Sequence, residues 1–296
     1  MHKNLKILLD IVRCHSPKNH VSQHVSRIYS IEMIVERLLS PQIAPYRNPH
    51  HSSSSISIIG GGTTPKPGEI SLAHRGVLFL DEMAEFPKKT LDMLRQPLEA
   101  GRVTISRAQS TVTYPSSFIL IAAMNPCPCG YQGSNSRYCT CTIKQVQAYK
   151  NRISGPIYDR IDILQFLHSV NLEQPTKSRT NSTDIRKRVE KARERQYERY
   201  EEQVCNAKVP FEKLQSTSPL KQHQMKLIRQ IAVKRQWSNH VQIKIIRLAR
   251  TISDLEGNRH INDESIWQAI NLRQEEHLKE QIIIERNQAG CLKDGD

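Results

Sequence analysis

The sequence predicts an α/β core followed by an all-helical C-terminal domain, and three observations lead to that prediction. Two apolar runs, "VLFL" at 77–80 and "FILIA" at 118–122, are continuous rather than alternating, as in parallel strands that are buried on both faces. A segment with helical spacing lies between them. Beyond residue 183 the apolar residues follow the period of a helix, so the sheet belongs to the first part of the chain.

Length and composition narrow the class of protein. The chain has 296 residues, of which 38% are apolar and 24% are charged, which is typical of a globular protein with one large or two smaller domains. No apolar run approaches the roughly 20 residues of a membrane span. The N-terminus lacks a long apolar core with a small-residue cleavage site. We therefore expect a cytoplasmic protein with no membrane partner.

The charge of the chain is strongly basic and unevenly distributed. Lys and Arg number 43 and Asp and Glu number 29, for a net charge of +14. Residues 221–251 contain eight Lys or Arg and no acid. Such a patch attracts polyanions and predicts salt-sensitive binding of nucleic acid. The alternative is a basic face that only keeps the protein soluble.

The first part of the chain changes from helical to loop-like composition. Residues 5–40 show the apolar spacing of helices. Residues 46–76 are rich in Ser, Gly and Pro, and the run "SISII" at 55–59 predicts a short strand followed by a glycine turn. The alternative for this segment is a disordered linker. It leads directly into an apolar strand, however, and loops that feed such strands often carry function.

The middle of the chain predicts the elements of the sheet in order. We expect residues 77–80 to form a buried parallel strand, and residues 87–100 to form a helix that Gly101 ends. The segment "RVTISRAQSTVTYP" at 102–115 alternates on both sides of a polar tip and predicts a hairpin. Residues 118–122 then supply the second buried strand.

A polar, proline-bearing segment at 171–182 predicts a linker, and the remainder predicts helices. Asn262 is the expected N-cap of the last helix, and Gly257 the expected stop of the helix before it. The expected helices are at 184–204, 218–236, 240–255 and 262–280.

Asp81 and Glu82 follow the first apolar strand directly. Parallel strands bind ligands at their carboxyl ends, where Asp81 would hold Mg²⁺ and Glu82 would polarise a hydrolytic water. Many strands end in acids without any such role, so this pair is a weak signal by itself.

Two further residues occupy comparable positions. Asn125 follows the second strand and could orient water near a phosphate, or it could only turn the chain before Pro126. Arg160 lies between two acids, Asp159 and Asp162. It could form an ion pair with one of them, or it could reach the nucleotide of a neighbouring subunit.

Four of the seven cysteines lie within fifteen positions, as two C-x-C pairs: Cys127, Cys129, Cys139 and Cys141. Clustering of this kind favours a metal site over a disulfide scaffold. Four thiolates suit a closed, structural Zn²⁺ site that would hold a loop without a core of its own. The alternatives are reduced thiols or another soft metal.

Together these residues resemble the Mg-chelatase-like AAA+ ATPases, and most closely the branch-migration helicase type linked to bacterial competence. The resemblance covers nearly the whole chain. The segments that carry it are "PHHSSSS", "IIGGGTTPKPGEISLAHRGVLFLDEM", "LDMLRQPLEAGRVTISRA", "FILIAAMNPCPCGYQG", "CTC", "RISGPIYDRIDI" and "RLARTISDLEG".

The resemblance implies an AAA+-like parallel-sheet core with a helical lid, ATP with Mg²⁺, a hexameric ring of itself or of intact family subunits, and DNA as the track. It assigns Asp81 and Glu82 as the Walker B acids, Asn125 as sensor 1 and Arg160 as the arginine finger. Residues 50–76 match an insert within the second helix, and residues 102–114 match the hairpin before sensor 1. In related ring motors such segments face the central pore, so the expected DNA contacts here are Lys66, Arg102 and Arg107.

The resulting domain prediction has four parts. Residues 1–170 form the core, with the cysteine insertion at 127–141, and residues 171–182 form the linker. Residues 183–283 form the lid, and residues 284–296 form a tail.

Two departures from the family pattern affect the nucleotide site. The sequence contains no G-x-x-x-x-G-K-[ST] loop, which would supply the backbone cradle for phosphates. Spacing aligns Lys3 with the lysine of that loop, so we expect a chain that is N-terminally truncated relative to the family. His240 stands where sensor 2 would place an Arg, and it lacks the planar fork of a guanidinium.

These departures leave three hypotheses. The first is a subunit of an ATP-driven DNA helicase for recombination of incoming DNA, with ATP binding and hydrolysis impaired in this chain. The second is a catalytically inactive module that binds DNA, or that joins a ring and offers Arg160 in trans. The third, a porphyrin metallation subunit, rests only on the name of the family.

Overall fold

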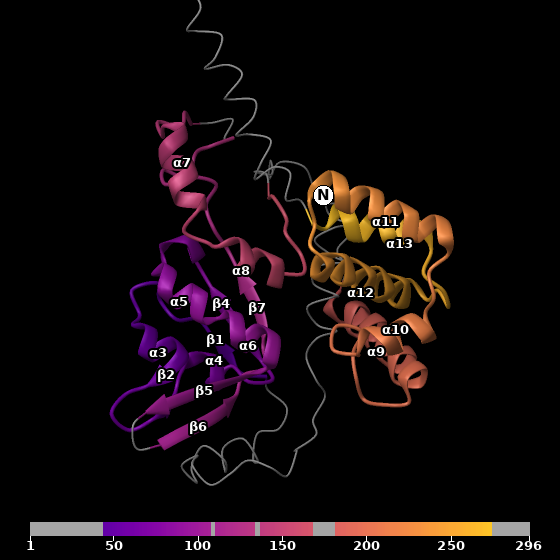
Figure 1. Cartoon of the computed structure of the whole chain (residues 1–296), viewed down its shortest axis with the longest axis horizontal. Helices are drawn as coiled ribbons and strands as arrows, with labels where there is room; N and C mark the ends of the chain where they lie inside the picture. The colour runs from indigo at the N-terminus through magenta and orange to yellow at the C-terminus, as the bar shows by residue number, and fades with distance from the viewer. Residues whose placement is uncertain (1–43, 108–109, 134–136, 168–180, 274–296) are drawn as a thin grey trace, which may run out of the picture. The chain divides into compact units, whose positions relative to one another are not determined.

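The computed structural model describes residues 44–107, 110–133, 137–167 and 181–273 (Figure 1). Contacts within the chain group these residues into two units. The first unit contains residues 44–124 and 152–157, and the second contains residues 125–151 and 158–273. None of the helices that the structure describes is long and apolar enough to cross a membrane.

Several predictions made from the sequence lie outside the described residues. They are the helical pattern at 5–40 together with Lys3, most of the linker at 171–182, the end of the last helix beyond residue 273, and the tail at 284–296.

The first unit is built on a small parallel sheet with the strand order β1-β4-β7. Val77 pairs with Ile119 and Leu80 with Ala122, so β4 and β7 run side by side along their full lengths. The elements of this unit in chain order are β1 (Tyr46–Arg47), α3 (Ser55–Ile59), β2 (Gly60–Gly61), β3 (Lys66–Pro67), α4 (Glu69–Leu72), β4 (Val77–Leu80), a 3₁₀ turn (Met83–Glu85), α5 (Lys88–Met93), α6 (Arg95–Ala100), β5 (Arg102–Arg107), β6 (Ser110–Pro115) and β7 (Ile119–Ala122).

The predicted parallel strands are confirmed, but β4 is buried on one face only. Leu78 and Leu80 are buried, whereas Val77 and Phe79 are half-buried. Phe79 stacks on the exposed ring of Tyr46 in β1, with ring centroids 6.4 Å apart. The continuous apolar run therefore predicts the position of the strand correctly. It overestimates the burial of the strand, because the described residues cover only one of its faces.

The expected strand at 55–59 is wrong, because these residues form helix α3. Ser54 caps the helix by accepting a hydrogen bond from the Ser57 amide at 3.1 Å. Ile58 and Ile59 are buried, and Gly60 ends the helix at φ 105. The cap outweighs the strand preference of the isoleucines.

The expected helix at 87–100 is interrupted once, at Leu94, between α5 and α6. Pro97 is the third residue of α6, and it has no N–H to donate to the carbonyl of Met93 four residues earlier. Gly101 ends α6 at φ 64, as predicted.

The predicted hairpin is confirmed as β5 and β6, with Arg102 opposite Pro115 and Arg107 opposite Ser110. It lies beside the short β2–β3 pair (Figure 1). The hydroxyl of Tyr114 donates to the carbonyl of Pro65 at 2.8 Å, which ties the hairpin to the glycine-rich insert.

The second unit contains the helical part of the chain, with α12 packed against α9, α11 and α13 (Figure 1). Asn262 caps α13 through the Ser265 amide at 2.7 Å, and Gly257 ends α12 at φ 86, both as predicted. Helix α10 was not predicted. The helices of this unit are α7 (Ile143–Lys150), α9 (Ser182–Tyr200), α10 (Phe211–Thr217), α11 (Gln222–Arg235), α12 (Asn239–Glu256) and α13 (Asp263–Asn271), and α8 (Gly155–Arg160) spans the division between the units.

A buried carboxylate, Asp254 of α12, joins α12 to α9 and to the loop that contains Asn206. Arg250 donates to Asp254 at 3.0 Å, and Asn206 donates to it at 2.8 Å. Arg199 of α9 makes a two-pronged contact with the same carboxylate. Asp254 and Arg250 have no exposed surface, so each depends on the other for compensation of its charge.

Replacing Asp254 by Ala is expected to reduce the free energy of unfolding by about 3–5 kcal/mol, because two guanidinium groups would lose their shared partner inside the fold. Urea denaturation followed by circular dichroism would measure the change. Glu202→Ala is the matched control, since it removes a carboxylate from an exposed pair with Lys213 and should cost less than about 1 kcal/mol. A loss for Asp254→Ala as small as that of the control would contradict the assignment.

Candidate functional site

Asp81 and Glu82 emerge at the carboxyl end of β4, where the sheet opens to solvent. The strand ladder continues past the strands, with the Ala123 amide bound to the Leu80 carbonyl and the Met83 amide bound to the Ala123 carbonyl, at 3.0 and 2.8 Å. Both carboxylates are exposed. The pair therefore lies where a parallel sheet presents side chains to a ligand.

The backbone turns sharply between the two acids and the helices that follow. Glu82 has φ 50 and ψ 47, in the left-handed region, and its amide donates to the Asp81 carboxylate at 3.0 Å. The 3₁₀ turn that begins at Met83 then carries the chain away from the sheet. This turn holds the two carboxylates on a short and defined piece of backbone.

His51 is a site residue that the sequence did not reveal. Its Nδ1 lies 3.3 Å from Oε2 of Glu82, and its ring meets Phe86 edge-on at 6.4 Å between centroids. The neighbouring His50 ring lies 4.1 Å away. The sequence did contain a signal for this residue, because "HH" follows β1. Since β1 runs parallel to β4, the two strands end at the same edge of the sheet.

The other predicted nucleotide-site residues belong to the second unit. Asn125 is exposed and follows the last residue of β7 by three positions. His240 is exposed in the first turn of α12, after the cap residue Ser238.

Arg160 ends α8 and is half-buried. Lys244 of α12 donates to the Arg160 carbonyl at 2.8 Å and to Asp162 at 2.5 Å. Asp159 accepts a hydrogen bond from Ser238 at 3.4 Å. The two acids that flank Arg160 are thus both tied to the region around the start of α12.

Lys66 and Arg107 each lie near Gly61, whereas Arg102 lies at the other end of β5. Gly61 pairs with Lys66 across β2 and β3, and Nη2 of Arg107 lies 3.4 Å from where a Cβ on Gly61 would be. Arg102 begins β5 and lies roughly 17 Å along the strand from Arg107. All three side chains are exposed.

The basic stretch at 221–251 is only partly a surface. Arg250 is buried in the Asp254 network, and burial lowers its pKa, although the nearby Asp254 carboxylate raises it. Arg247 donates to the carbonyls of Ala207 and Val209. Arg250 therefore adds no charge to the surface.

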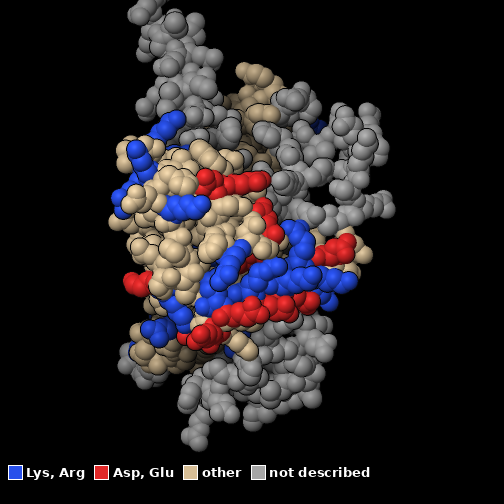
Figure 2. Space-filling view, turned by 90° about the vertical axis from the view of Figure 1, so that its right-hand side faces the viewer, with Lys and Arg blue, Asp and Glu red and all other residues tan. Residues whose placement is uncertain are grey.

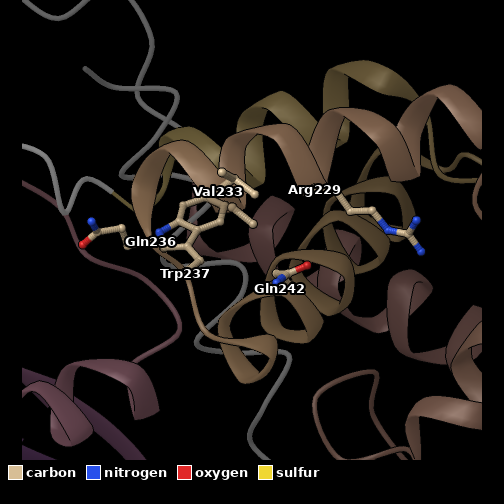
Figure 3. A pocket seen from close by; sticks show the side chains of 6 residues that line it. Arg229, Val233, Gln236, Trp237 and Gln242 are labelled. Atoms are coloured by element: carbon tan, nitrogen blue, oxygen red, sulfur yellow. The ribbon is translucent and has the colours of Figure 1, made fainter.

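Three bases of α11 remain exposed, namely Lys226, Arg229 and Lys234. Beside Arg229 lies an open hollow of about 500 Å³, whose lining includes Val233, Gln236, Trp237 and Gln242 (Figure 3). Its lining contains no acid and no nucleophile, so we assign it no chemistry. Figure 2 shows a face on which the bases lie in a band beside Asp and Glu side chains, which weakens the attraction of that face for a polyanion.

The four predicted cysteines do come together, with all four sulfur atoms within 4.8 Å of one another. The Sγ of Cys127 lies 3.4 Å from that of Cys129 and 3.7 Å from that of Cys139, and the last two are 3.5 Å apart. A tetrahedral ion with metal–sulfur bonds of about 2.3 Å needs sulfur–sulfur edges of roughly 3.8 Å. The donor set therefore fits a tetrahedral soft metal.

The surroundings of the sulfurs shift the pKa values of the thiols in opposite directions. The Gln132 amide donates to the sulfur of Cys127 at 3.4 Å. A hydrogen bond from the Tyr131 backbone, together with the neighbouring thiols, lowers the pKa of Cys129 to about 6. For Cys139 the Cys141 backbone acts in the same direction, but burial and the thiols of Cys129 and Cys127 raise its pKa to about 12. The four thiols thus interact as they lose their protons, and a divalent ion that binds them would displace the remaining protons.

Comparison with known proteins identifies the family of the chain. The family profile described as "Magnesium chelatase, subunit ChlI" matches residues 7–175, and that described as "Magnesium chelatase, subunit ChlI C-terminal" matches residues 179–273. An uncharacterised protein of Salmonella typhimurium, YifB, is 40% identical over 236 residues, which are 78% of this chain and 46% of that protein. Competence protein ComM of Haemophilus influenzae is 40% identical over 233 residues, which are 77% of this chain and 45% of that protein.

The chain spans about half the length of the curated relatives it matches. The two family profiles together cover all of the described residues. The chain therefore belongs to the family of magnesium chelatase subunit ChlI and its relatives.

Proposed function

We propose that this chain is part of a Mg-chelatase-like ATPase that acts on DNA, and that it supplies the acid pair of the nucleotide site. The observation that carries the proposal is the exposed pair Asp81 and Glu82 at the carboxyl end of β4, beside a second parallel strand that leads to Asn125. In this proposal Asp81 holds Mg²⁺ and Glu82 polarises the attacking water.

The remaining roles follow from membership in the family. Asn125 orients the water or the γ-phosphate, and Arg160 reaches the nucleotide of a neighbouring subunit in a hexameric ring. His51 holds the Glu82 carboxylate through the 3.3 Å contact. ATP and Mg²⁺ are the cofactors that these roles require.

The 296-residue chain contains no G-x-x-x-x-G-K-[ST] loop. Without the backbone N–H groups of such a loop, the acid pair has nothing within this sequence to hold the phosphates opposite it. We infer that this chain by itself binds ATP weakly and hydrolyses it no faster than the background rate. The second candidate function, a module that binds DNA or joins a ring without hydrolysing ATP, is favoured by the same observation.

DNA is the proposed partner, with branch migration during recombination of incoming DNA as the proposed role. A relative named competence protein supports this choice. Lys66 and Arg107, which each lie near Gly61, form one proposed contact. The exposed bases of α11 form a second contact, through charge attraction to phosphates.

For the cysteine cluster we propose structural Zn²⁺. The sulfur–sulfur distances of 3.4–3.7 Å and four protein ligands leave no open position for a reaction. The ion would fix a loop that has little apolar core of its own.

The chain alone is expected to release phosphate from Mg·ATP at the background rate, with Glu82→Gln making no difference. Added to an intact member of the family, it should change the ATPase rate of that protein, and Arg160→Ala should remove the change. A phosphate-release assay measures both. Turnover by the chain alone that Glu82→Gln abolishes would contradict the proposed impairment.

Arg107→Ala is expected to weaken DNA binding at every sequence and to reduce the slope of log affinity against log salt by about 0.9, the value for one lost phosphate contact on duplex DNA. Fluorescence anisotropy across a salt series measures this slope. Lys89→Ala, which removes an exposed charge from α5, is the control and should leave the slope unchanged. An affinity that does not change with salt would contradict the proposed DNA contacts.

Protein purified without chelators is expected to carry one zinc per chain, measured by atomic emission. Cys127→Ser should lower the zinc content and loosen the loop, whereas Cys205→Ser, outside the cluster, should not. Because thiolate ligands must lose their protons to bind, zinc should be retained near neutral pH and released as the pH falls. Zinc-free protein with a fully protease-resistant loop would count against the metal.

A further inference from the structure

The cysteine cluster carries aromatic side chains that its own fold does not use. Tyr138 is 89% exposed, the largest fraction among the large hydrophobic side chains that the structure describes, and Tyr131 is 36% exposed. Exposing a ring of this size forgoes the free energy of burying it. Large exposed aromatic groups therefore point to a ligand rather than to the stability of the monomer.

Both tyrosines are positioned by the sulfur atoms. Tyr138 directly precedes Cys139, and Tyr131 lies two residues after Cys129, whose sulfur is 3.5 Å from that of Cys139. The Tyr131 backbone also forms a hydrogen bond to the sulfur of Cys129. Each ring thus lies within two residues of a cysteine of the cluster, so less conformational entropy is lost when a ligand binds.

A guanidinium lies between the two tyrosines in the sequence and contacts one of them. Arg137 donates to the hydroxyl of Tyr131 at 2.6 Å, and its central carbon lies 5.2 Å from the centre of that ring. The group is planar, positive and exposed. A planar cation beside aromatic rings suits a ligand that has both flat faces and negative charge.

The charge around this segment has one sign. From residue 100 to residue 158 the sequence has no Asp or Glu, and it has six Lys or Arg. Lys144, in the first turn of α7, is exposed. No carboxylate of the segment therefore opposes the approach of a polyanion.

We propose that Tyr131, Arg137 and Tyr138, named here the tyrosine surface, bind unpaired bases of single-stranded nucleic acid. Tyr138 stacks on a base, and Arg137 meets the adjacent phosphate while it supports the ring of Tyr131. Stacking tolerates any base, so the surface selects single strands over duplex without reading sequence. This inference rests on the proposed function. Beside the proposed contacts at Arg107 and α11, it adds a second kind of binding site, which prefers single strands.

A protein partner is the competing occupant of an exposed tyrosine. The planarity of Arg137 beside two tyrosine rings favours nucleic acid, because flat bases and phosphates match both the rings and the charge, whereas an acidic protein would match the charge alone. The two occupants give different results in the following experiment.

The test compares the affinity of the zinc-loaded full chain for oligothymidine and for duplex DNA by fluorescence anisotropy. Tyr138→Ala is expected to weaken the binding of oligothymidine about tenfold, within the range of aromatic–base stacks, and to leave the binding of duplex unchanged. Tyr138→Phe keeps the ring and should stay within about twofold of the wild type. Trp267→Ala, which removes an exposed aromatic ring from α13, is the matched control and should have no effect.

Salt dependence and cross-linking separate a direct contact from misfolding. Tyr138→Ala should leave the salt slope unchanged because no charge is lost, whereas Arg137→Ala should reduce it by about 0.7, the value for one contact on a single strand. Ultraviolet cross-linking to bromouracil-substituted single strands should mark Tyr131 or Tyr138 in mass spectra.

Each remaining outcome decides against some part of the proposal. If Arg107→Ala weakens binding and Tyr138→Ala does not, the tyrosine surface is wrong while the DNA role survives. If the wild-type chain binds no nucleic acid at low salt, both fail. If Tyr138→Ala changes only the sedimentation of the protein, the surface is a protein contact.

Discussion

The parallel pairing of β4 with β7 is the constraint on which the candidate site depends. Because Leu80 pairs with Ala122 and the ladder runs on through Ala123, the two strands end at the same level. Side chains that follow parallel strands must then leave at one edge of the sheet. The turn at Glu82, the contact with His51 and the path toward Asn125 all begin at this edge. A slip of one residue would move Leu78 and Leu80 to the half-covered face.

The second unit depends on a different kind of interaction, which is buried charge rather than backbone pairing. Asp254 accepts hydrogen bonds from Arg250, Arg199 and Asn206 at the centre of the helices. Such a cluster tolerates little rearrangement, because any shift leaves an ion without a partner in a medium of low polarity. Residues that looked like a basic surface in the sequence therefore serve the interior, and the exposed positive charge is limited to fewer side chains than the sequence suggested.

Most of the sheet, the hairpin and the long helices could be predicted from the sequence, since they follow from apolar period and from end signals such as Gly101 and Asn262. The cysteine cluster could be predicted as well, because spacing alone restricts how four thiols can meet. The helix at 55–59 could not, since its isoleucines favour a strand and only the structure shows that Ser54 caps a helix. His51 was not predicted, although "HH" follows β1, because its contact with Glu82 joins residues that are distant in sequence.

Glu82 has a backbone conformation that suits glycine better than an acid. A residue with a Cβ at φ 50 carries a cost of about 1–2 kcal/mol relative to ordinary helical backbone. A sequence chosen only for folding would therefore place glycine at this position and gain stability by discarding the carboxylate. Design methods that maximise stability would erase this site first, and the strained turn marks it as a place where folding and chemistry make opposite demands on one residue.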